Sequence, residues 1–156
     1  MNRAASGVRA LVGLYACAAC GGDPPVDTVP ACLGVAPDVA CTTALYGDHD
    51  GKLAPTYADV FTNTLKPECA TMGCHTAPDP PNGLAFDDEA TSYAALLSMN
   101  AAGTGPRLVP GDAKCGELVV RLETAGKSWS MPQGGHLDDA TLCAIRRFIA
   151  DGAPQK

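Results

Sequence analysis

Aromatic residues are scarce in this chain of 156 residues, at 5 % of the total, with a single tryptophan among them. The length suits one domain of ordinary size plus a tail, but the apolar core would be modest for that length. Disulfides or a buried apolar group would supply part of the missing stability. Basic residues are few as well, because 11 Lys and Arg side chains face 17 Asp and Glu, for a net charge of −6. Since no basic patch is present to neutralise phosphates, we expect no nucleic-acid partner.

The chain also lacks the motifs of hydrolytic and nucleotide chemistry. It has no paired carboxylates, no Ser/His/Asp set, no glycine-rich phosphate loop and no HExxH sequence. We therefore predict that the protein is not an enzyme.

Cysteine, by contrast, is abundant, and eight cysteines argue against a reducing cytosol. The N-terminus indicates the same compartment. Arg3 and Arg9 precede an apolar run over residues 10–19, which is too short to span a bilayer and is typical of a secretory signal. We predict a signal peptide over residues 1–19.

A cysteine that follows small residues at the end of such a run is typical of a bacterial lipidation site. Cys17 has the better leucine three residues earlier, whereas Cys20 has the better small residues and is followed by a Gly/Pro-rich segment. We predict lipidation at Cys20. Residues 20–55 are rich in proline and show no helical or strand period, so we expect a linker from the anchor to a domain over residues 56–154.

The stretch with the most specific chemistry is Cys69-Ala70-Thr71-Met72-Gly73-Cys74-His75. Two thiols on one short turn can form thioether bonds to the two vinyl groups of a haem, and the following imidazole can reach the iron. The usual signature has two residues between the cysteines, and this chain has four. Residues 70–73 must then bulge outward, and Gly73 allows the turn to tighten.

Helical periodicity recurs four times. We expect a helix from a capping box at Thr56 to Pro67, a second capped by Asp87 or Asp88, a third from Asp112, and a last from Asp138 to Gly152. No segment alternates with a period of two, so we predict an all-α domain of about four helices with long loops.

These segments together resemble the planctomycete-type cytochrome c domain of myxobacterial and planctomycete lipoproteins, which is similar to class I cytochromes c. The resemblance covers residues 57–154. It rests on the ordered series VFTNTLKPECATMGCHTAPDPPNGLAF (60–86), RLVPGD (107–112), SMPQGG (130–135) and ATLCAIRRFIADGAP (140–154).

The resemblance implies a cytochrome c-like fold with one covalent haem c, attached at Cys69 and Cys74 and ligated through iron by His75. It also implies Met131 as the sixth iron ligand, delivered from the loop between the last two helices; Met99 and His136 are the next candidates. The implied function is electron transfer to a redox partner protein by a lipoprotein of the periplasm or cell surface.

The remaining cysteines are expected to form disulfides. Sequence alone does not fix connectivity, but the simplest pairing closes Cys32–Cys41 within the linker. Parity and placement near two helix starts then favour Cys115–Cys143, around the loop that bears Met131.

Two alternatives remain open at this stage. In one, Cys69 and Cys74 form a disulfide, and the protein is a haem-free binding or structural lipoprotein on the same fold. In the other, Cys69, Cys74, His75 and a distant fourth ligand hold zinc.

Overall fold

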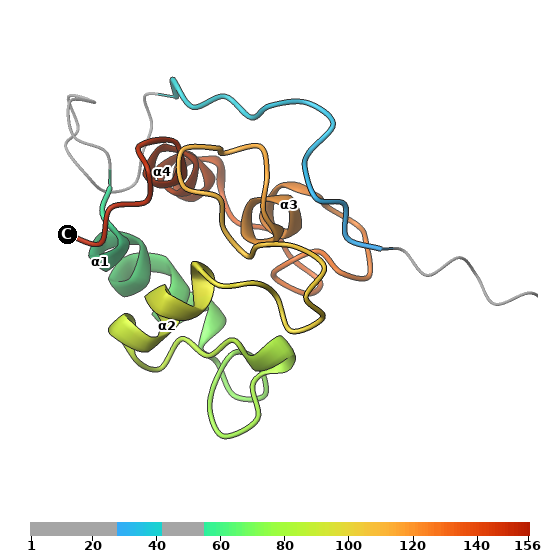
Figure 1. Ribbon diagram of the computed structural model, residues 1–156, viewed down its shortest axis with the longest axis vertical. Coiled ribbons are helices and arrows are strands. Elements are labelled where there is room, and N and C mark those ends of the chain that lie inside the picture. The colour runs from blue at the N-terminus through green and yellow to red at the C-terminus, as the bar shows by residue number, and fades with distance from the viewer. Residues whose placement is uncertain (1–27, 42–54) are drawn as a thin grey trace, which may run out of the picture.

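The structure is a computed structural model, which describes residues 28–41 and 55–156. These residues form a mostly helical domain with four α-helices and no β-sheet among them (Figure 1). The all-α prediction is therefore confirmed at this level. The described residues contain no helix that is long and apolar enough to cross a membrane. The expected signal peptide (1–19) and Cys20 lie outside the described residues.

The first helix begins where its capping box predicts and continues beyond the predicted end. α1 (Tyr57–Val60) has Thr56 as its N-cap, and the Asp59 carboxylate accepts a hydrogen bond from the Thr56 N–H at 2.8 Å. We expected Pro67 to end the helix, which is wrong. The chain continues as a π-helix, η1 (Phe61–Cys69), with Pro67 inside it. The wider turn removes the clash of proline with the carbonyl of residue i−4, so the helix reaches Cys69.

The later helices begin at polar caps, with one exception. α2 (Glu89–Leu96) is capped by Asp88, and α4 (Asp139–Ala150) by Asp138, whose carboxylates accept the N–H of Thr91 and Thr141. These bonds to the charged form lower the pKa of both carboxyl groups. Both caps were predicted. α4 ends at Ala150, and Gly152 follows with a positive φ of 88°.

The exception is α3 (Glu117–Glu123), which we expected to begin at Asp112. Its N-cap is Gly116. Asp112 instead caps a turn, because its carboxylate accepts the N–H of Lys114 at 2.9 Å. Residues 114–116 are held in an extended bridge to an N-terminal segment, so they are not available to a helix.

Tyr57 of α1 lies in an aromatic cluster that includes Phe148 of α4. The ring of Tyr57 lies 4.9 Å from that of Tyr93 and 6.0 Å from that of Phe148, between centroids. The Tyr57 hydroxyl bonds the Ser92 hydroxyl at 2.7 Å, and the Tyr57 N–H donates to the Pro154 carbonyl at 2.7 Å. Burial raises the Tyr57 pKa far above its ordinary value. The packing of Tyr57 against Phe148 and its bond to Pro154 fix the position of α1 relative to α4. Because η1 continues from α1, they also fix the position of Cys69.

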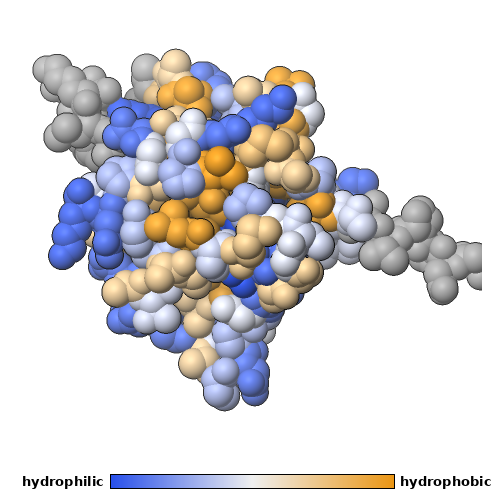
Figure 2. All heavy atoms as spheres, in the orientation of Figure 1, coloured by the Kyte–Doolittle hydropathy of each residue, from blue (hydrophilic) through white to orange (hydrophobic). Residues whose placement is uncertain are grey.

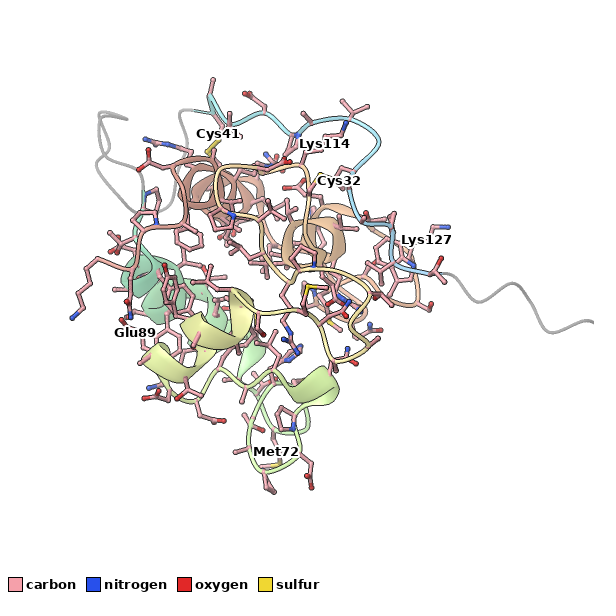
Figure 3. The ribbon with its side chains drawn as sticks, in the orientation of Figure 1. Cys32, Cys41, Met72, Glu89, Lys114 and Lys127 are labelled. Atoms are coloured by element: carbon pink, nitrogen blue, oxygen red, sulfur yellow. A yellow bond between two sulfur atoms is a disulfide. The ribbon has the colours of Figure 1, made fainter. Side chains whose placement is uncertain are left out.

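An extended N-terminal segment over residues 28–41, here called the strap, crosses from the start of α3 to α4 (Figures 1 and 3). Disulfides join Cys32 to Cys115 and Cys41 to Cys143, with Cα–Cα distances of 4.0 and 6.0 Å. The four cysteines were correctly predicted to be in disulfides, but the pairing Cys32–Cys41 and Cys115–Cys143 is wrong.

The physical reason is the hydrogen bonding of the strap. The Leu33 N–H donates to the Lys114 carbonyl at 2.9 Å, and the Gly116 N–H donates to the Ala31 carbonyl at 3.0 Å. These bonds place Cys32 beside Cys115, and the extended strap then carries Cys41 to α4. The two bridges close a covalent ring made of residues 32–41 and 115–143. The segment that bears Met131 is part of this ring.

Gly116 is the tightest point of this junction. Its φ is +102°, and a Cβ there would lie 3.1 Å from both the Leu108 Cα and the Val109 N. We expect Gly116→Ala to lower the free energy of unfolding by about 3 kcal/mol, since backbone strain and overpacking add. Gly103→Ala is the matched control, because its φ is +67° but nothing lies within 4 Å of the added Cβ. It should cost about 1 kcal/mol. Urea unfolding measures both, and equal costs would contradict the tight packing at Gly116.

Candidate functional site

A pocket of about 350 Å³ opens beside the end of η1. Its wall comes from six parts of the chain: the end of η1 with the turn after it, residues 81–86, Leu96 of α2, Arg107, α3, and residues 131–133. All four residues predicted to bind the cofactor line this one pocket, namely Cys69, Cys74, His75 and Met131. Apolar side chains also reach the molecular surface, where Figure 2 shows them gathered near the middle of one face and bordered by hydrophilic residues.

The turn between the two cysteines bulges outward, as predicted. The Cys74 N–H donates to the Thr71 carbonyl at 2.9 Å, and the His75 N–H donates to the Cys69 carbonyl at 3.0 Å. Gly73 has a φ of +82°, the left-handed conformation that favours glycine. Met72 is fully exposed at the tip (Figure 3). The longer spacer is therefore accommodated in solvent, while both cysteines remain on the pocket wall.

His75 is held by contacts that the sequence did not reveal. Its Nδ1 lies 2.7 Å from the Leu84 carbonyl oxygen, and its ring packs against Phe86 with centroids 5.4 Å apart. A carbonyl can only accept, so Nδ1 carries the proton of the neutral ring and Nε2 keeps its lone pair. A carbonyl partner at the other ring nitrogen is the usual support of a ligating histidine. This tautomer leaves the Nε2 lone pair of His75 available for coordination.

Cys69 and Cys74 are free thiols, although four other cysteines of the described residues are in disulfides. Cys74 is exposed and Cys69 is partly buried. Burial, together with the nearby Glu68 and Cys74, raises the pKa of the Cys69 thiol to about 11.

The two thiols should differ in reactivity toward an alkylating reagent, because the thiolate is the nucleophile. At pH 8 roughly one Cys69 in a thousand is ionised. We expect iodoacetamide to modify Cys74 first, and the Cys69 rate to rise about tenfold per pH unit toward pH 11. Peptide mass spectrometry measures both rates, and denatured protein is the control in which the rates converge. Equal rates in the folded protein at pH 8 would contradict the burial of Cys69.

Met131 is half-buried on a different chain segment of the pocket wall, and its N–H donates to the Arg121 carbonyl at 2.9 Å. The other candidate sixth ligands are placed elsewhere. Met99 is 51 % exposed and His136 is exposed, and neither lines the pocket.

Arg107 adds a charge that the sequence only hinted at. It is 7 % exposed and lines the pocket. Its guanidinium donates to Asn82 O and Ser98 Oγ at 2.7 Å each, to Ala95 O at 3.3 Å, and to Met99 O. All four acceptors are neutral oxygens, so none of these bonds neutralises the charge of the guanidinium. An anionic group of a bound ligand would complete this environment.

The alternative of a zinc site is not supported by the side chains of residues 28–41 and 55–156. No three His, Cys, Asp or Glu side chains in these ranges are grouped so that they could hold a metal ion.

Comparison with known proteins found no matching family model, no matching curated protein and no matching solved structure. The chemistry of the pocket's own side chains is therefore the basis for assigning a function.

Proposed function

We propose that this pocket binds one c-type haem and that the protein is a mono-haem electron carrier with a cytochrome c-like fold. The observation that carries the proposal is the convergence, in one pocket, of two free thiols, a histidine with a free Nε2 and a methionine. A bound haem supplies a one-electron iron centre. The rest of the function belongs to the residues that hold it.

The donor set fits a haem on each count. Cys69 and Cys74 supply the thiols for two thioether bonds, and His75 supplies a nitrogen ligand next to them. Met131 supplies a thioether sulfur, a ligand that raises the reduction potential of haem iron. Soft sulfur and imidazole ligands both suit iron.

The apolar character of the pocket wall supports a porphyrin ligand. Apolar side chains of Leu65, Leu84, Phe86, Leu96 and Leu122 line it, and they exclude water from a ring edge. Arg107 lines the same wall, where a propionate could pair with its guanidinium. The Leu84 carbonyl keeps the imidazole in one tautomer and orientation.

The disulfides indicate an oxidising environment, extracellular or periplasmic. We propose that Cys20 is lipidated and anchors the domain in the bacterial cell envelope. The strap follows this anchor in the chain, and its two bridges link it to Cys115, just before α3, and to Cys143 in α4. A carrier fixed in this way would exchange electrons with a redox partner protein at the envelope.

A haem-free binding lipoprotein is the second candidate. It is favoured by the pocket volume of about 350 Å³, near the lower end of the usual range of about 300–1,000 Å³ for ligand pockets. A small apolar carboxylate paired with Arg107 would suit this volume.

Visible absorption separates the two functions. The full chain, produced in a host that attaches c-type haem, should show the bands of a low-spin c-type cytochrome on reduction. The double variant C69S/C74S should lose them. Met72→Ala is the matched control, because Met72 lies in the same turn but is fully exposed. Loss of haem in C69S/C74S alone supports the proposal, whereas a colourless wild-type protein favours the binding lipoprotein.

A further inference from the structure

Arg121 ties the Met131 segment to α3 through two hydrogen bonds. Its carbonyl accepts the Met131 N–H at 2.9 Å, and its guanidinium Nη1 donates to the Trp129 carbonyl at 2.8 Å. The residue between them, Ser130, is 6 % exposed. Arg121 therefore holds this short segment at two points, one on each side of a buried residue.

The guanidinium is itself held in place by Glu117, one turn earlier on the same helix. Nε and Nη2 of Arg121 lie 2.8 and 2.5 Å from the Glu117 Oε1. The three nitrogens thus serve two different partners in a fixed plane, which a lysine ammonium cannot reproduce. Both side chains line the pocket that Met131 lines.

We propose that Arg121, oriented by Glu117, is a positioning residue that keeps the Met131 sulfur directed into the pocket. The inference rests on the proposed function only in taking haem iron as the group that the Met131 sulfur contacts in the pocket. A single thioether sulfur on a loop is easily displaced, so a ligand of this kind needs its loop fixed. Local bonds shape the loop, such as Lys127 N–H to Ser130 Oγ at 3.0 Å, but the Arg121 bonds set its place against α3.

The role of Arg121 can be tested by Arg121→Lys, and the chain offers a matched control for this substitution at Arg146. Arg146 also donates two hydrogen bonds to one glutamate, from Nε to Glu123 Oε1 at 2.5 Å and from Nη2 to Glu123 Oε2 at 2.6 Å. Its side chain is buried to nearly the same degree as that of Arg121. That pair joins α4 to α3 and does not line the pocket. R121K and R146K should therefore cost similar stability and differ at Met131.

The decisive readout needs no haem. In the folded, haem-free full chain, dilute hydrogen peroxide should oxidise Met131 about tenfold faster in R121K than in the wild type. Fully exposed Met72 is the internal standard, and the emission of Trp129, the single tryptophan, should shift in the same variant. R146K should leave both signals unchanged. An unchanged Met131 rate in R121K, or an equal rise in R146K, overturns the proposal.

The haem-bound protein adds a second readout. In R121K the reduction potential should fall, and the sulfur-to-iron charge-transfer band of the oxidised protein should weaken, while R146K keeps both. A wild-type protein that takes up no haem defeats the proposed function, yet Met131 oxidation still decides the role of Arg121. If R121K does not fold, E117Q decides instead. This variant keeps the Arg121 side chain but removes the carboxylate that orients its guanidinium. Faster Met131 oxidation then supports the proposal, and an unchanged rate overturns it.

Discussion

The double variant C41A/C143A should unfold with a free energy about 4 kcal/mol lower than that of the wild-type protein. The bridge it removes joins residues separated by 102 positions, for which the chain-entropy relation gives about 4.7 kcal/mol. The Cys32–Cys115 bridge reduces this figure, because it shortens the chain path between Cys41 and Cys143 to residues 32–41 and 115–143. Cys143 is fully buried, so its replacement by alanine also leaves a small void.

Urea unfolding of the oxidised protein measures the effect. The control is C69A/C74A, which removes two free thiols and no cross-link. It should change the free energy of unfolding far less in haem-free protein. A non-reducing peptide map completes the test, since it should join Cys32 to Cys115 and Cys41 to Cys143. A disulfide found between Cys32 and Cys41 would contradict the observed pairing of the strap. An unfolding midpoint of C41A/C143A equal to that of the wild type would contradict the stabilising role of the Cys41–Cys143 bridge.

Replacing His75 by alanine should lower the yield of low-spin haem protein at least tenfold. The imidazole is the proposed nitrogen ligand, and even the loss of a residue that supports a ligand typically costs about 10–100-fold in metal affinity. The fold itself should survive, because the ring makes one hydrogen bond and one ring contact, to Leu84 and Phe86. The expected cost in haem-free stability is about 1 kcal/mol.

His136→Ala is the control for this variant. His136 was a candidate ligand from the sequence but is exposed and does not line the pocket. Its replacement should leave the absorption spectrum and the haem yield unchanged. A wild-type spectrum in His75→Ala, or loss of haem in His136→Ala, would show that the iron ligand has been misassigned.

The features that the sequence predicted correctly depend on neighbouring residues. Thr56, Asp88 and Asp138 cap helices through bonds to residues three positions later, so their patterns can be read directly. The outward bulge between Cys69 and Cys74 follows from the spacer length and from Gly73 in the same way. Local chemistry fixes these features regardless of the rest of the chain.

The features that were predicted wrongly depend on distant residues. The strap competes with α3 for residues 114–116, so Asp112 does not start a helix and Cys115 meets Cys32. Parity and spacing of cysteines cannot reveal such a pairing. The supports of the pocket were missed for the same reason. Leu84 bonds His75 through its backbone carbonyl, and the Arg121 guanidinium bonds the backbone carbonyl of Trp129. Backbone carbonyls leave no signal in side-chain patterns.

Covalent attachment of a haem at Cys69 and Cys74 is tested most directly by the mass of one peptide. Lys66 is followed by Pro67, which trypsin does not cleave, so both cysteines remain on the peptide over residues 53–107. For protein made in a host that attaches c-type haem, we predict that this peptide carries the mass of one haem and no free thiol. The same peptide without haem, with two thiols or an internal disulfide, would contradict covalent haem attachment at Cys69 and Cys74.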